Sequence, residues 1–186
     1  MTTVSPLNSF IEGAPSGPWK EGEITSSTAD LQITDIPSTA ISLDVIITNL
    51  VPVSDGTAFY MRTSSDNGSS FDSTAGDYSY TGRFLNSTAS YGYNSSASAA
   101  FIYLGHQAAG SSANENLNYR VRLFRPGNAG NFTKILNDCI GYTSTPFTGG
   151  GFGGGVRESA GKVNAVQFYM SSGNIASLKW KAYLNK

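Results

Sequence analysis

The chain has 186 residues, which is enough for one well-cored domain. Only 13% of them are charged, about half the usual share in soluble domains, and the net charge is −1. Such a balance, without any run of lysine or arginine, argues against nucleic acid as a partner. No segment approaches the roughly 18 apolar residues of a membrane span, and no secretory signal is visible. We therefore expect synthesis in a cytoplasm, with neither nucleic acid nor membrane as a partner.

Residues 1–22 are rich in proline and glycine and predict an extended N-terminal arm. Such an arm can lie along a neighbouring subunit; a frayed terminus is the alternative. Residues 23–186 then form a single domain. Alternating apolar and polar residues recur through this domain, as in "ISLDVII", "TAFYMRT", "NYRVRLF" and "SLKWKAYL". Alternation of this kind is typical of half-buried antiparallel strands.

No segment carries a convincing helical stripe, although "FTKILNDCIGY" is compatible with a strand or one helical turn. About eight to ten short strands separated by glycine, serine and asparagine turns predict an all-β fold, an antiparallel β-sandwich. Jelly-roll topology is the preferred version.

The stretch "SSDNGSSF", residues 64–71, matches the Asp-box pattern of a hairpin turn. In that device the aspartate caps backbone N–H groups and the glycine takes a positive φ. Asp66, Asp72 and Asp77 are also weak candidates for a calcium site, because a longer loop could fold back on a cation. Their spacing differs from that of an EF-hand loop, so the turn is preferred.

Three tyrosines, Tyr91, Tyr93 and Tyr103, form a second candidate set. If exposed, they could stack on a sugar ring while Asn86 and Asn94 supply hydrogen bonds. Aromatic residues on half-buried sheets are more often packing residues, and this remains the alternative.

Residues that usually carry catalysis are scarce. His106 and Cys139 are the only histidine and cysteine, so one chain offers neither a disulfide nor a zinc site of the usual type. The run "FTGGGFGGGVRESAGK", residues 147–162, lacks the strand and helix that flank a phosphate-binding loop. We expect it to be a flexible or tightly packed loop that suits an assembly contact. No carboxylate pair can be assigned, and we expect a protein that is not an enzyme and needs no cofactor.

Three longer segments, residues 29–56, 55–80 and 161–184, resemble small β-sandwich virion proteins of tailed bacteriophages and prophages. The closing segment "GKVNAVQFYMSSGNIASLKWKAYL" is the most specific of them. The resemblance implies a virion structural component that binds phage capsid or tail proteins, and it supplies no catalytic or ligand-binding residues. Capsid decoration, with the arm gripping the shell, is our first expectation; a tail fibre or adhesin that binds host glycan is the alternative. A homo-oligomer is expected, and a trimer is favoured because capsids offer three-fold sites.

Overall fold

The computed structural model describes residues 17–105, 108–145 and 148–186, and these residues contain twelve β-strands and no helix. Among them, nothing helical is long and apolar enough to cross a membrane. The strands are β1 (Lys20–Ile24), β2 (Asp30–Ile33), β3 (Ser42–Pro52), β4 (Phe59–Ser64), β5 (Tyr78–Asn86), β6 (Tyr91–Ala99), β7 (Ile102–Tyr103), β8 (Leu117–Phe124), β9 (Lys134–Tyr142), β10 (Thr148–Arg157), β11 (Ala165–Met170) and β12 (Ile175–Asn185).

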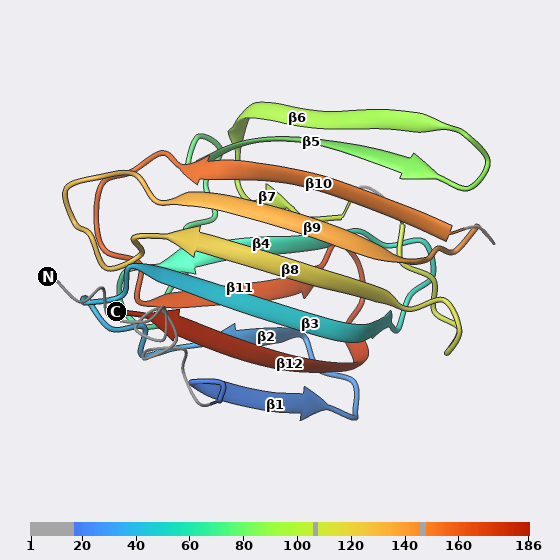
Figure 1. The fold of residues 1–186 in the computed structure, drawn as a ribbon, viewed down its shortest axis with the longest axis horizontal. Coiled ribbons are helices and arrows are strands. Elements are labelled where there is room, and N and C mark those ends of the chain that lie inside the picture. The colour runs from blue at the N-terminus through green and yellow to red at the C-terminus, as the bar shows by residue number, and fades with distance from the viewer. Residues whose placement is uncertain (1–16, 106–107, 146–147) are drawn as a thin grey trace, which may run out of the picture.

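The strands form two antiparallel sheets, which confirms the predicted β-sandwich (Figure 1). The large sheet has eight strands in the order β1-β12-β3-β8-β9-β10-β5-β6, and the small sheet has four in the order β2-β11-β4-β7. In the first half of the large sheet, β1 pairs with β12, β12 pairs with β3, and β3 pairs with β8. In the small sheet, β2 pairs with β11, β11 pairs with β4, and β4 pairs with β7. This interleaving of early and late strands is the jelly-roll order.

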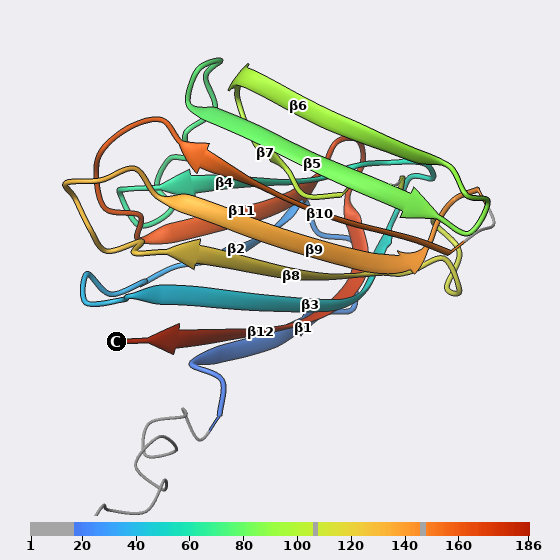
Figure 2. The ribbon, with the colours of Figure 1, turned by 45° about the horizontal axis from the view of Figure 1, so that its top comes forward.

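Two hairpins are inserted into that jelly roll. One consists of β9 and β10, between β8 and β11; the other consists of β5 and β6, between β4 and β7. They pair with each other through β10 and β5, and so extend the large sheet by four strands beyond β8. Figure 2 shows the β5–β6 hairpin at the border of the molecule, with β6 outermost.

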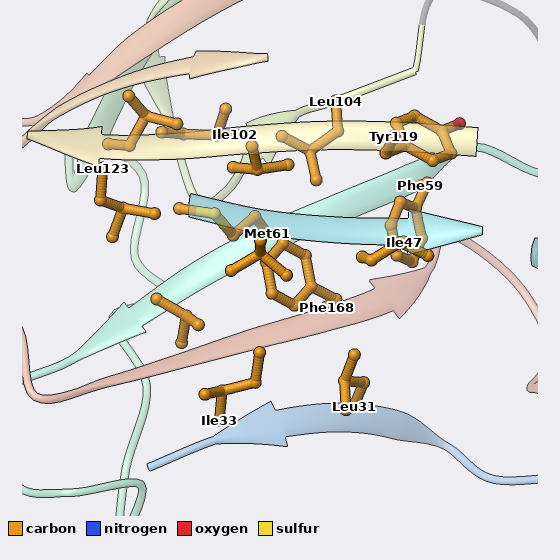
Figure 3. Close-up of a cluster of buried hydrophobic side chains, with 14 of the residues drawn as sticks. Leu31, Ile33, Ile47, Phe59, Met61, Ile102, Leu104, Tyr119, Leu123 and Phe168 are labelled. Carbon is orange, nitrogen blue, oxygen red and sulfur yellow. The ribbon is translucent and has the colours of Figure 1, made fainter. Parts of the chain in front are cut away.

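The core lies between the two inner faces (Figure 3). Phe59 on β4 and Phe168 on β11 stack at 5.9 Å between ring centroids, and Phe59 meets Tyr119 of the opposite sheet at 5.0 Å. Alternation predicted these inward positions: Leu43, Val45 and Ile47 are fully buried, as are Met61, Val121 and Leu123. Ile41, which the same alternation assigned to this face, is 56% exposed because it precedes β3. Each large side chain buried in this way contributes about 1.5–3 kcal/mol.

Twelve strands form in the described residues where about eight to ten were expected, and three local expectations also need adjustment. The glycine run predicted as a loop is instead β10, a strand inside the large sheet that pairs with β9 and β5. The "FTKILNDCIGY" segment, left open between strand and helical turn, forms β9. Most of the predicted arm lies outside the described residues, but residues 20–22 belong to β1 and therefore to the sandwich.

Candidate functional site

The outer face of the large sheet divides into two halves of different chemistry. On β1, β12, β3 and β8 the outward side chains are mostly charged and paired with one another. Glu21 lies 3.3 Å from Lys181 across the β1–β12 ladder, and Arg122 donates from Nε to Asp44 at 2.7 Å. That hydrogen bond, together with the charge of Asp44, raises the pKa of Arg122. We call this surface the charged half.

On β9, β10, β5 and β6 the outward side chains are largely apolar although they face solvent. Phe152 is 58% exposed and Ile140 is 59% exposed, whereas Ile46 and Phe124, two apolar outward residues of the charged half, are 38% and 36% exposed. We define the apolar half by its exposed large side chains, which are Leu85, Tyr91, Tyr93, Leu136, Ile140, Tyr142 and Phe152. A contiguous apolar patch rimmed by polar residues marks an interaction surface on a folded domain.

Strand register brings these side chains together. Phe152 pairs with Arg83 on β5, which pairs with Tyr93 on β6, and the three form one row across the sheet. One row away, Leu85 pairs with Tyr91. Paired residues of antiparallel strands lie about 4.5–5.5 Å apart and point to the same side, so each row is a line of touching side chains.

A shallow groove of about 830 Å³ runs over this half. Its floor includes Gly154, which occupies an outward position of β10 between Leu136 on β9 and Thr81 on β5. Because glycine has no side chain, this position is left empty. A Cβ atom at Gly154 would lie 2.4 Å from the carbonyl oxygen of Ile135, so the close approach of β9 and β10 requires glycine here. Phe152, Arg83 and Ser95 also line the groove. The result is a largely apolar surface with a hollow lined by two cations, Arg83 and Lys134, and with one anion, Asp138, paired with Phe152.

The candidate site lies entirely on the two inserted hairpins. The jelly-roll strands carry the charged half and most of the core, whereas the inserted strands carry seven of the twelve exposed large apolar residues of the described structure. Functional sites are commonly added to a fold in this way, because the scaffold supplies stability while the additions vary.

Asp66 has the structural role that the Asp-box pattern predicts. Its carboxylate accepts the hydroxyl of Ser64 at 2.6 Å and the hydroxyl and N–H of Ser70 at 2.6 and 2.9 Å. These hydrogen bonds lower its pKa to about 2. Gly68 has the expected positive φ of 89°. The carboxylate of Asp66 therefore stabilises the turn by accepting hydrogen bonds from residues within it.

The other two candidate aspartates are held elsewhere. Asp72 accepts from Nε of Arg157 at 2.6 Å and from the hydroxyl of Thr63 at 3.0 Å. Asp77 accepts the N–H of Thr74 at 2.6 Å. In the described part of the chain, no three histidine, cysteine, aspartate or glutamate side chains gather closely enough to hold a metal ion. The three aspartates are therefore not brought together.

The three candidate tyrosines separate as well. Tyr91 and Tyr93 point outward from β6 and are 83% and 77% exposed. Tyr103 on β7 instead packs in an aromatic cluster, with its ring centroid 5.7 Å from Tyr60 and 6.2 Å from Tyr80. Burial raises the pKa of Tyr103 to about 12. Of the three, only Tyr91 and Tyr93 are largely exposed.

The predicted amide partners do not accompany them. Oδ1 of Asn86 accepts the N–H groups of Thr88 and Ser90 and so caps the β5–β6 turn. Asn94 alternates with Tyr93 along β6 and points to the opposite side of the sheet. The polar groups that share the row of Tyr93 are Arg83 on β5 and Asp138 on β9, and neither was predicted. His106 lies outside the described residues.

Leu136, Ile140 and Phe152 were also not predicted as site residues. A signal for two of them exists in β9, where Ile135 and Cys139 point inward while Leu136 and Ile140 point outward. A strand that is apolar on both faces is typical of burial on both sides. Phe152 had no such signal, because six glycines surround it in β10.

No protein-family model matches this chain, and no curated protein matches it either.

Proposed function

We propose that the protein is a non-enzymatic structural subunit of a bacteriophage particle, bound to its exterior, with capsid decoration or cementing as its role. The observation that carries the binding role is the apolar half of the large sheet. The three resembling segments support a virion origin, and low surface charge favours close packing of subunits.

The apolar half suits a protein surface better than a small ligand. Sites for small molecules are concave and enclose most of the ligand, whereas this groove is shallow and the exposed side chains spread over four strands. Covering side chains that are about half exposed gains on the order of 1 kcal/mol each. Several must be covered at once to overcome the entropy lost on association, which is about 4–15 kcal/mol. A broad protein partner achieves this; a monosaccharide does not.

A second function is favoured by one observation. Tyr91 and Tyr93 are the most exposed large apolar side chains in the described structure, and they lie on the same face two residues apart. Two neighbouring aromatic rings beside a cation can bind an extended glycan. The alternative is therefore a tail fibre or adhesin module that binds host surface carbohydrate.

Particle mapping tests the proposal. Purified virions examined by cryo-electron microscopy, with copy number measured by quantitative gel, should show many copies spread over the capsid. A few copies at the tail would favour the adhesin, and absence from the particle would refute both. Deleting residues 1–16, which leaves β1 intact, tests whether the predicted arm grips the shell.

Two matched variants test the surface itself. Ile140→Ser in the apolar half should weaken rebinding to stripped particles, whereas Ile46→Ser in the charged half should not. For the adhesin, Tyr91→Ala combined with Tyr93→Ala should abolish binding to a glycan array while Ile140→Ser leaves it intact. Equal rebinding by both serine variants would contradict the proposed interface.

A further inference from the structure

Strand β6 is an unprotected sheet edge. It runs for nine residues, "YGYNSSASA", without a charge or a proline, and it is the outermost strand in both views (Figures 1 and 2). The other described edges differ: β1 has five residues of which three are charged, β2 has four residues, and β7 has two. Native proteins protect free edges with short strands, charges or prolines, because an open edge pairs with other chains. Only β6 among these edges has none of those protections, and the irregularity in its pairing with β5 lies between Ser96 and Ala99, outside residues 91–95.

The turn that joins β5 to β6 shows which backbone groups face the open edge. The N–H of Asn86 donates to the carbonyl of Ser90 at 3.1 Å, so that pair is of the hydrogen-bonded kind. Hydrogen-bonded and non-hydrogen-bonded pairs alternate along an antiparallel ladder. Given the register, Tyr91, Tyr93 and Ser95 form non-hydrogen-bonded pairs with β5. Their N–H and C=O groups therefore point away from β5 and toward solvent.

We propose that two copies of the chain pair antiparallel through these edges, about a two-fold axis at Tyr93. In this register Tyr93 faces Tyr93 of the other copy, and Tyr91 of each copy faces Ser95 of the other. About six hydrogen bonds then satisfy every outward group of the three residues in both copies. The edge is complementary to itself because its free groups are spaced symmetrically around Tyr93.

The side chains also favour a second copy as the partner. A two-fold axis perpendicular to the sheet places both outer faces on the same side, so the two Tyr93 rings become cross-strand neighbours. Aromatic pairs in this position are favourable, and β6 has no charge that would oppose its own copy. The apolar halves of the two copies join into one surface along the Phe152–Arg83–Tyr93 row.

This contact does not depend on where the protein resides, and it can be tested on the purified chain. It is a two-fold contact, so it joins subunits in pairs or links neighbouring oligomers. The trimer expected by analogy with capsid symmetry would need a different surface.

Sedimentation equilibrium of the full chain should show a monomer–dimer equilibrium. Tyr93→Pro removes an N–H that the monomer does not use, so the fold should survive while pairing is lost. Ser95→Lys places a charge on the edge and should raise the dissociation constant roughly tenfold or more. Thr81→Lys is the control, because Thr81 pairs with Ser95 on the same face but lies on β5, away from the edge. Near-ultraviolet circular dichroism confirms that each variant is folded.

Disulfide trapping tests the register. Opposed residues in a hydrogen-bonded pair have Cα atoms about 5.5 Å apart, within disulfide reach, so Tyr93→Cys should give a covalent dimer on mild oxidation. Arg83 lies one strand further from the edge, so the Cα atoms of the two cysteines in Arg83→Cys would be about 14 Å apart. This variant should not form a cross-link. The native Cys139 is buried and lies on β9.

Three results would overturn the inference. One is a monomer at every concentration; another is a dimer unaffected by Tyr93→Pro and Ser95→Lys. The third is a dimer that disappears on deletion of residues 1–16 while Tyr93→Cys gives no cross-link, which would show that the arm, and not the β6 edge, joins the two copies. None of these outcomes bears on whether the protein is found on virions, so the two proposals fail separately.

Discussion

Removing the carboxylate of Asp72 should leave a buried, unpaired cation at the end of β10. Nε of Arg157 donates to Oδ2 of Asp72 at 2.6 Å, and the Arg157 side chain is only 5% exposed while that of Asp72 is 26% exposed. Breaking a buried ion pair from one side costs about 3–5 kcal/mol. Because water can reach the carboxylate position, we expect Asp72→Ala to cost about 2–4 kcal/mol. The melting temperature should then fall by roughly 5–15 °C.

Urea unfolding of the full chain measures this cost, with two comparisons. Arg157→Met combined with Asp72→Ala removes both charges, so the double variant should be more stable than the sum of the single changes predicts, by about 1.5 kcal/mol or more. Glu21→Ala breaks the exposed pair with Lys181 and should cost less than about 1 kcal/mol. If Asp72→Ala costs no more than Glu21→Ala, Arg157 does not depend on this carboxylate and the reasoning is wrong.

Three further predictions concern the strand of glycines, acid stability and calcium. Gly154→Ala should destabilise the fold by about 1–3 kcal/mol, since its Cβ would lie 2.4 Å from a backbone oxygen, whereas Gly17→Ala has nothing within 4 Å and should be neutral in the same urea assay. Hydrogen bonds from Asn67 and Ser64 respectively lower the pKa values of Asp35 and Asp66 to about 2, from 3.8. The stability from these two carboxylates is present above about pH 4 and is lost as the pH falls toward 2, so Asp35→Asn should flatten the pH dependence of the melting temperature there; an unchanged slope would contradict this. Calcium should shift the melting temperature by about 1 °C or less, because the Asp66 carboxylate already accepts hydrogen bonds in its turn, and a rise of several degrees would restore the calcium hypothesis.

The sequence predicted the fold at most positions where side chains alternate. Leu43, Val45 and Ile47 are buried as expected, and the Asp-box residues fold into the expected turn. Both signals are local: alternation has the period of a strand, and a capping carboxylate acts within a few residues. Local signals do not depend on which strands later become neighbours.

The glycine strand could not be predicted, because glycine carries no side chain and so shows no alternation. Its place in the sheet is decided by its neighbours: β9 and β5 supply ladder partners on both sides, and their close approach excludes any Cβ at Gly154. Isolated, the same run of glycines would favour a flexible loop.

The candidate site was decided by tertiary structure for a related reason. Tyr91, Tyr93 and Tyr103 look alike in sequence, yet the pairing of β7 with β4 takes Tyr103 into an aromatic cluster while β6 leaves the other two outside. Likewise, Arg157 and Asp72 are 85 residues apart and meet only after β10 has entered the sheet. Alternation in the sequence predicts which residues share one face of a strand. Which side chains that face contacts is determined by the order of the strands in the folded sheets.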